Sequence, residues 1–218
     1  EEYVMTISDL INHKAGFYYS TTKTDCLNNL IASKNLASSV DSNEMINRLS
    51  ELPLIQTPGE KFYYGLNTTI LGFVLERATG KTLRQLLKDR IIDPFGIEGL
   101  DYIKNDSIKL LPVFSGVDNT VRLANQGELD ILGQDVPSYE PENKLFLGGE
   151  GMIATTNGYA DFLRILLNNG KLNGVNFLNK STIKEMSSPH TQIENEYGYN
   201  GYNLWVTSDK HIEEGPGD

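Results

Sequence analysis

The feature that most constrains the fold is a pair of neighbouring helical patterns, separated by a glycine and ended by a proline. Apolar residues recur at helical spacing from about residue 68 to residue 78, and Gly80 follows as a helix end. The pattern returns after Thr82 and is predicted to stop at Pro94, because proline lacks the amide hydrogen that a helix interior needs. The buried face of the first helix is predicted to consist of Ile70, Leu71, Val74 and Leu75.

Other stretches predict further helices. Capping signals and apolar periodicity indicate helices from Thr6 to near Gly16, over residues 24–34 and over residues 41–53. A later helix is predicted over residues 157–170. A short helix follows it, and Ser181 is expected to cap that helix.

The segments between and after these helices predict less regular structure. Residues 97–147 are rich in Asp, Asn, Gly and Pro and are predicted to form a long, partly irregular excursion with one hairpin. Residues 197–207 alternate loosely and are rich in aromatic residues, which predicts a strand. The chain is therefore expected to be helix-rich, with its sheet mostly near the C-terminal end.

Composition limits the kinds of partner. The chain has 218 residues, with 19 Lys and Arg against 29 Asp and Glu, and a formal net charge of −10. An acidic chain repels phosphate backbones and anionic lipid surfaces, so neither nucleic acid nor an anionic membrane is expected as a partner. The longest apolar runs, such as residues 70–75, fall far short of the ~18 residues that span a bilayer, so no transmembrane segment is expected.

The sequence predicts no cofactor and no metal. Cys26 is the single cysteine, so a disulfide within the chain is excluded. Residues 149–154 fit a dinucleotide-binding glycine pattern, but polar residues separate it from the next helix, so a glycine-rich turn is the better interpretation. The histidines are too far apart in sequence to form a metal-ligand motif; they are His13, His190 and His211.

Four side chains are candidates for a functional site. Ser20 and Lys23 fit a Ser-x-x-Lys pattern, in which a lysine one helical turn on takes the serine proton. The polar residues that follow favour a capping serine before a solvated lysine instead. Tyr64 precedes the strongest helix, where a close cation would let it act as a general base; the alternative is half-buried packing. Glu150 lies on a bare glycine turn, either solvated or projecting into a cleft.

Three stretches match one family pattern in order and spacing. Residues 5–17, MTISDLINHKAGF, are close to ITIRDLLTHTSGL. Residues 58–97 run from PGEKFYYGLN through LG and TG to PFGI, close to PGxxFxYSN…LLGxIIExxTGxx…PLGM. Residues 148–170 run from GGEGMIAT to LLNNG, close to GGxGLxST…F…LLNGG. Together they resemble the serine beta-lactamase and penicillin-binding-protein-like family, and in particular its class C beta-lactamase-like branch, which includes family VIII carboxylesterases.

The resemblance implies an α+β fold, a helix-rich segment of a beta-lactamase/transpeptidase-like fold with a helical domain and part of an antiparallel sheet. Residues 1–218 are then a partial domain. Residues 4–190 are mostly its helical domain, and residues 195–210 start the returning sheet strands. In the family the Ser-x-x-Lys motif precedes the segment matched by residues 5–17, and a late His/Trp-x-Gly motif follows the sheet strands. Both motifs are expected to lie outside this chain.

The resemblance also implies roles for single residues. Tyr64 matches the catalytic tyrosine of the family and is expected to be the general base or a proton relay. The third position of its motif is Leu66, where most beta-lactamases have asparagine, and this departure favours the esterase-like branch. Asn67 is displaced by one position and is a candidate substrate contact. Gly149 and Glu150 are further candidate substrate contacts, because the family places this turn at the wall of the active site.

These observations predict a segment of a serine hydrolase that acts through an acyl-enzyme on a small-molecule ester, beta-lactam or peptide. The alternative is a non-catalytic relative that serves as a binding or sensing module, since the chain shows no credible nucleophile. A third and weaker hypothesis takes Ser20 and Lys23 as the catalytic pair. For the location, the resemblance favours the bacterial envelope, periplasmic or exported, over the cytoplasm.

Overall fold

The computed structural model describes residues 3–105, 109–116, 120–125, 139–193, 198–209 and 212. The helices among them are α1 (Ile7–Ile11), α2 (Asp25–Ser33), the 3-10 helix η1 (Leu36–Ser38), α3 (Ser42–Leu49), α4 (Asn67–Thr79), α5 (Leu83–Leu87), the π-helix η2 (Lys88–Ile92), α6 (Asp93–Phe95), α7 (Thr156–Leu167) and α8 (Lys180–Met186). The strands are β1 (Leu100–Asp101), β2 (Phe114–Ser115), β3 (Arg122–Leu123), β4 (Ile153–Ala154), β5 (Lys171–Leu172), β6 (Val175–Asn176), β7 (Thr191–Gln192), β8 (Gly198–Asn200) and β9 (Trp205–Thr207).

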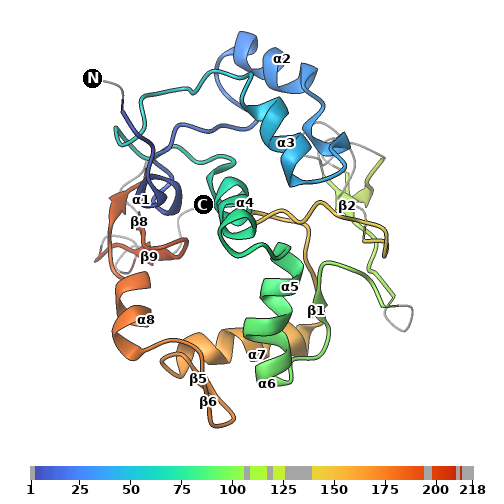
Figure 1. The fold of residues 1–218 in the computed structure, drawn as a ribbon, viewed down its shortest axis with the longest axis vertical. Coiled ribbons are helices and arrows are strands. Elements are labelled where there is room, and N and C mark those ends of the chain that lie inside the picture. Colours follow the sequence, from blue (N-terminus) through green and yellow to red (C-terminus); the bar gives the residue numbers. More distant parts are fainter. Residues whose placement is uncertain are drawn as a thin grey trace.

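In space, α4 lies near the centre of the molecule (Figure 1). The helices α2 and α3 lie at one end, and α5, α6 and α7 lie toward the other. The N-terminal α1 lies beside the late strands β8 and β9. None of the described helices is long and apolar enough to cross a membrane.

Local capping signals start the early helices where the sequence predicted, although α1 ends at Ile11, before the predicted stop near Gly16, and α3 ends at Leu49, before the predicted end at residue 53. The Thr6 hydroxyl accepts the Asp9 amide at 3.2 Å, and the Asp9 carboxylate accepts the Thr6 amide at 2.8 Å, a complete capping box that starts α1. The Asp41 carboxylate caps α3 through the Glu44 amide at 2.9 Å. These signals act within one turn, so the neighbouring sequence is enough to specify them.

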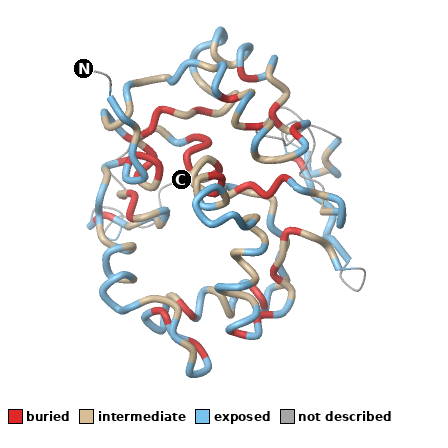
Figure 2. The backbone as a smooth tube through the Cα atoms, viewed as in Figure 1, coloured by how far each residue is buried: buried red, intermediate tan, exposed pale blue. Residues whose placement is uncertain are grey.

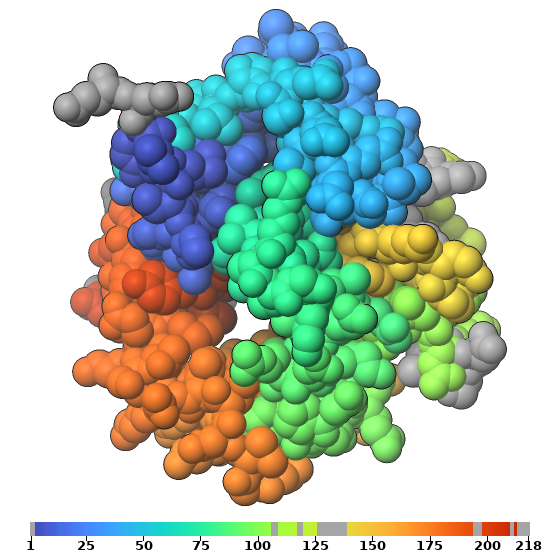
Figure 3. Space-filling view, in the orientation of Figure 1, coloured from blue at the N-terminus to red at the C-terminus, as the bar shows by residue number. Residues whose placement is uncertain are grey.

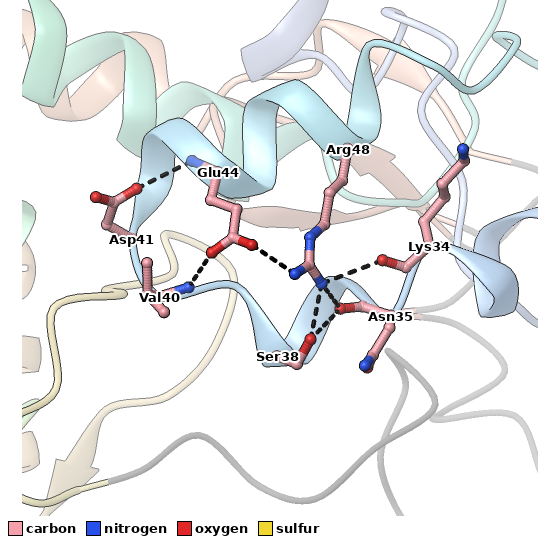
Figure 4. Close-up of polar contacts among 7 residues, drawn as sticks. All are labelled: Lys34, Asn35, Ser38, Val40, Asp41, Glu44 and Arg48. Atoms are coloured by element: carbon pink, nitrogen blue, oxygen red, sulfur yellow. Dashed lines mark hydrogen bonds and ion pairs between the residues drawn. The ribbon is translucent and has the colours of Figure 1, made fainter.

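A cluster of polar contacts joins α3 to the end of α2 (Figure 4). Arg48 donates to the backbone carbonyls of Lys34 and Asn35 and to the Ser38 hydroxyl, and its other nitrogen pairs with Glu44 on the same helix. The Val40 amide also donates to Glu44, at 2.8 Å. The bond from Val40, followed by the bond from Arg48, holds the pKa of Glu44 below its ordinary value. One guanidinium thus satisfies carbonyls that the end of α2 leaves free.

The prediction that Pro94 stops the second helix is wrong. The chain stays helical through η2 and α6, and it leaves the helix only at Gly96, which has a left-handed backbone with φ of 62°. Pro94 lies in the first turn of α6, where a missing amide hydrogen costs nothing. The cap of α8 also differs from the prediction, because Asn179, and not Ser181, occupies that position.

The sheets are all antiparallel, in agreement with the expected α+β class. β1 pairs with β4, and β2 with β3 and β5 with β6 form two further pairs. The β2–β3 pair confirms a hairpin within the 97–147 excursion, of which residues 106–108, 117–119 and 126–138 lie outside the described residues. The single strand predicted over residues 197–207 is instead a hairpin of β8 and β9, with β7 on its other side. Residue 197 lies outside the described residues.

Two apolar cores support this arrangement, and Figure 2 shows buried stretches in both the upper and the lower half of the view. The first joins α2, α3 and α4 to the segment before the glycine-rich turn, and consists of Tyr18, Ile31, Leu36, Met45, Leu49, Leu66, Phe73, Leu145 and Leu147. The second joins α6 and α7 to the nearby strands, and consists of Phe95, Ile97, Leu100, Ile165 and Leu172.

The buried face of α4 differs from the predicted stripe. Its buried residues are Asn67, Thr69, Gly72 and Phe73, whereas Leu75 is 44% exposed. The cause is the segment 145–149, which crosses α4 in close contact. A Cβ atom on Gly148 would lie 2.3 Å from the Thr68 carbonyl oxygen, and a Cβ on Gly72 would lie 3.3 Å from Gly148 Cα. Small residues, and not large apolar ones, therefore form the closest part of this contact.

Candidate functional site

A cleft of about 280 Å³ lies where three distant parts of the chain meet. They are the segment after α1 together with the loop that enters α4, the glycine-rich turn, and the β8–β9 hairpin. The lining residues are His13, Tyr19, Phe62, Tyr64, Gly65, Thr68, Gly148, Gly149, Asn200, Asn203 and Trp205.

His13 occupies an unusual position at the end of α1. The Lys14 amide bonds to the Asp9 carbonyl at 2.7 Å and the His13 amide to the Leu10 carbonyl at 3.2 Å, which is the Schellman pattern of a helix end. Glycine usually fills the left-handed position of that motif, but here it is His13, with φ of 53°. This backbone geometry turns the His13 ring toward the cleft, where it is only 6% exposed.

The loop that carries Tyr64 docks directly on this helix end. The Tyr63 amide donates to the His13 carbonyl at 2.7 Å. Gly65 lies so close to Phe17 that a Cβ atom on it would fall 2.2 Å from the Phe17 carbonyl oxygen, so only glycine fits there. The Tyr64 ring consequently stacks on the His13 ring, with centroids 5.1 Å apart and planes 22° apart. On another side it meets Tyr19, with centroids 5.8 Å apart.

The C-terminal sheet is anchored to three consecutive residues at the end of α1. Asn200 donates through Nδ2 to the Ile11 carbonyl at 3.2 Å, and the Thr191 hydroxyl donates to Oδ1 of Asn12 at 3.3 Å. At His13, ring nitrogen Nε2 lies 3.1 Å from Oδ1 of Asn203. Figure 3 shows the N-terminal and C-terminal segments, dark blue and orange-red, in contact on one face of the molecule. This docking closes one side of the cleft.

Burial dominates the electrostatics of the cleft. Burial lowers the pKa of His13 below its ordinary value, and the hydrogen bond with Asn203 opposes this effect without cancelling it. Burial likewise raises the pKa of Tyr19, and the neighbouring Tyr64 and Glu150 raise it further. Both side chains are therefore neutral near pH 7. Burial, followed by the charge of Glu150, also raises the pKa of Tyr139.

The sequence-predicted site residues are placed as follows. Tyr64 and Gly149 line the cleft, and Tyr64 is 56% exposed. Glu150 is partly buried beside the lining, close enough to act on Tyr19. Asn67 is fully buried, and its amide nitrogen faces the Tyr63 carbonyl at 3.2 Å and His13. A substrate contact by Asn67 stays a prediction.

The structure does not support the weaker Ser-x-x-Lys hypothesis, because Ser20 and Lys23 do not lie on a helix. Residues 20–23 form a turn and bend that precede α2, whose first residue is Asp25. The chemistry requires a serine at a helix N-terminus with its lysine one turn along the same helix. Ser20 and Lys23 are therefore not arranged as a catalytic pair.

Several lining residues were missed by sequence reasoning, and His13 and Asn203 are the most important. The segment that resembles the family included His13 but assigned it no role, and Asn203 fell within the stretch predicted as a strand. Their contact spans 190 residues, so no local pattern could reveal it. For metals, the described part of the chain brings no three of its His, Cys, Asp and Glu side chains together in a way that could hold an ion.

Comparisons with known proteins agree with the resemblance. Residues 1–214 match the family model Beta-lactamase. Protein Rv1367c of Mycobacterium tuberculosis (strain ATCC 25618 / H37Rv) is 25% identical over 202 residues, which cover 92% of this chain and 48% of that protein. Monacolin J acid methylbutanoyltransferase of Aspergillus terreus (strain NIH 2624 / FGSC A1156) is 27% identical over 187 residues, which cover 85% of this chain and 42% of that protein.

Among solved structures, one described as "EstCE1, a hydrolase with promiscuous acyltransferase activity" is similar to this fold with a TM-score of 0.78. It is 20% identical, and the match covers 98% of this chain and 59% of that one. The chain spans about half the length of the curated relatives it matches.

Proposed function

The chain belongs to the beta-lactamase family, and from this premise we propose that it forms part of a serine hydrolase that cleaves an ester through an acyl-enzyme. The observation that carries the proposal is the position of Tyr64. Its phenol stands at the wall of the cleft, on the loop that enters α4, between the rings of His13 and Tyr19. This is the loop whose sequence resembles the tyrosine motif of the family.

The proposed reaction has two halves. A serine, supplied by a Ser-x-x-Lys segment on the N-terminal side of residue 1, attacks the ester carbonyl and forms a new C–O bond. Tyr64 accepts the serine proton and passes it to the departing alcohol as the old C–O bond breaks. Water then cleaves the acyl-serine, with Tyr64 again moving the proton. A tyrosine acts as a base only beside a cation, and the lysine of that motif is the proposed cation.

Leu66 supports an ester over a beta-lactam as the substrate. It occupies the motif position at which most beta-lactamases have asparagine. In this chain Leu66 is only 1% exposed and packs in the first core. It therefore offers no polar group to a bound amide. The names of two similar proteins, an acyltransferase and a hydrolase with acyltransferase activity, agree with acyl transfer.

We further propose that the glycine-rich turn borders the bound acyl group. Gly149 lies in the cleft lining, and a Cβ atom on it would lie 3.1 Å from the Thr69 hydroxyl. A bare backbone at this point lets a substrate approach closely. Glu150, just beyond it, is proposed to contact the substrate from the edge of the turn.

The test compares two tyrosine variants of the natural full-length protein that contains this chain. Tyr64→Phe is expected to lower kcat/KM for a small p-nitrophenyl ester by about 100-fold or more, because it removes the proton carrier. Tyr159→Phe is the matched control, since Tyr159 is 53% exposed, close to the 56% of Tyr64, and lies on α7. The control is expected to stay within about 2-fold of the wild type.

Full activity of Tyr64→Phe would refute the role proposed for this residue. Labelling the full-length protein with a fluorophosphonate probe tests the nucleophile separately. One adduct on a serine before residue 1 would support the proposal. No adduct and no ester hydrolysis would overturn it in favour of a binding or sensing role.

A further inference from the structure

We propose that His13 is a positioning residue: its imidazole, held at both ring nitrogens, stacks on Tyr64 and sets the orientation of the phenol in the cleft. Tyr64 is 56% exposed, so burial does not fix its ring. The His13 ring on which it stacks is buried and makes polar contacts at each nitrogen. What Tyr64 does chemically is taken from the proposed function, whereas the geometry of the ring pair does not depend on it.

The Asn67 amide determines the proton state of one ring nitrogen. Nδ2 of Asn67 donates to the Tyr63 carbonyl at 3.2 Å, and a carbonyl oxygen can only accept. The amide must therefore present its nitrogen, and not its oxygen, on this side. The same Nδ2 lies 3.4 Å from Nδ1 of His13. Because Nδ2 is a donor, Nδ1 must accept and carry no proton.

The other ring nitrogen follows from this assignment. A neutral imidazole without a proton on Nδ1 carries it on Nε2. Nε2 lies 3.1 Å from Oδ1 of Asn203, which accepts that proton in a hydrogen bond. The protonated Nε2 thus requires the Asn203 amide to turn its oxygen toward the ring, and the Thr68 hydroxyl donates to the same oxygen at 3.3 Å. Burial favours the neutral ring that this arrangement requires.

Three segments therefore converge on one ring: the start of α4 through Asn67 and Thr68, the β8–β9 turn through Asn203, and the end of α1 through the His13 backbone. If the hydrogen bond with Asn203 is lost, the imidazole can turn about its χ2 bond. The Tyr64 ring that stacks on it is then no longer held in one orientation. Substrate binding depends on the rest of the cleft. The expected consequence is a lower kcat with little change in KM.

The first test reads the tautomer directly in the natural full-length protein. Nitrogen-15 NMR of histidine rings distinguishes a protonated from an unprotonated ring nitrogen, and the His13 signals are assigned through bonds to its backbone. At pH 7.5 we expect a proton on Nε2 of His13 and none on Nδ1. A proton on Nδ1, alone or together with Nε2, would overturn the proposal.

The second test compares two turn asparagines. Asn203 and Asn173 both have a left-handed backbone, with φ of 56° and 50°, so glycine adds no strain at either position. Asn203→Gly removes the hydrogen bond with His13 and is expected to lower kcat for a small ester about 5- to 30-fold, with KM within about 2-fold. It is also expected to move or broaden the Tyr64 signal in protein labelled with [13Cζ]tyrosine. Asn173→Gly, in the β5–β6 turn, should match the wild type in both measurements.

These measurements separate the two proposals. A Tyr64→Phe variant with full activity would refute the proposed function, and the Tyr64 NMR signal would then decide the positioning role alone. A Tyr64 signal that is unchanged in Asn203→Gly would overturn the positioning role, whatever the activity. A changed signal with a lower kcat and an unchanged KM would support it.

Discussion

Replacing Gly148 with alanine is expected to destabilise the protein and to displace one wall of the cleft. The new Cβ atom would lie 2.3 Å from the Thr68 carbonyl oxygen and 3.1 Å from the Thr68 carbonyl carbon. Both atoms belong to the backbone of α4, so no change of side-chain rotamer relieves the clash. The segment that carries Gly148 must lift away from the helix instead.

The size of the effect follows from this displacement. The favourable separation of non-bonded heavy atoms is roughly 3.5 Å, so the segment has to move by about 1 Å. Leu145 and Leu147, which are 8% and 2% exposed, sit just before Gly148 and would lose part of their packing in the first core. Forced overpacking of this kind costs about 1–3 kcal/mol of unfolding free energy.

The assay is urea unfolding followed by far-UV circular dichroism, with the ester-hydrolysis rate measured on the same preparations. Gly116→Ala is the matched control, because a Cβ atom there meets nothing within 4 Å and the backbone needs no left-handed conformation. Gly148→Ala should unfold at a lower urea concentration than the control and show a lower kcat/KM, since Gly149 in the cleft moves with it. Unfolding free energies that agree within about 0.5 kcal/mol would refute the close-contact argument.

Two other changes test contacts that support the cleft from behind. Tyr102→Phe removes the buried hydroxyl that donates to the Leu147 carbonyl at 2.8 Å, and should cost about 1–2 kcal/mol in urea unfolding, whereas Tyr159→Phe should cost almost nothing. For Asp101, burial alone would raise the pKa, but the paired bonds from Arg84 at 2.6 and 2.7 Å, together with bonds from the backbone amides of Tyr102 and Ile103, outweigh it and lower the pKa. A lowered folded-state pKa gives stability that is present above the unfolded-state value near 4 and is lost as the pH falls through the folded-state value. Arg84→Met should therefore lower the unfolding free energy by about 1 kcal/mol at pH 7 and flatten the dependence of Tm on pH below about 5. If Tm depended on pH below about 5 in this variant as it does in the wild type, Arg84 would not be what lowers the pKa of Asp101.

The parts of the fold that sequence predicted well depend on neighbouring residues. Thr6 with Asp9 and Asp41 with Glu44 satisfy helix ends within one turn, and the structure confirms both caps. The extent of the second helix was mispredicted because Pro94 was treated as an interior residue. In the structure the π-helical turn η2 runs directly into α6, and the proline falls in the first turn of α6. Phe95, directly after the proline, packs in the second core, and a local pattern does not contain that contact.

The prediction of the buried face of α4 failed for a related reason. Large apolar side chains were expected to face inward, but the crossing segment at Gly148 comes so close that Gly72 and Thr69 face it instead. Close backbone contacts select small residues, and such a contact cannot be predicted before the partner segment is known. The same holds for the cleft: the family resemblance pointed to Tyr64, whereas the contact between His13, on which its ring stacks, and Asn203 spans 190 residues.

The backbone of His13 gives an independent reason to assign a task to its side chain. A left-handed conformation costs a non-glycine residue about 1 kcal/mol, and glycine would fill the end of α1 without that cost. Asparagine tolerates the conformation well, and Asn35, Asn169 and Asn173 adopt it away from the cleft, so the backbone of Asn203 alone carries little weight. Histidine also enters this region more often than most residues, but glycine would still fill the position without strain. The His13 ring contacts Tyr64 and the side-chain amides of Asn67 and Asn203. Backbone strain of this kind is found where the side chain of the strained residue is needed. His13→Gly should therefore relax the backbone while it removes the ring. The stability change, measured by urea unfolding, would be the loss of the side-chain contacts and the entropy cost of glycine, offset by the relief of about 1 kcal/mol of backbone strain.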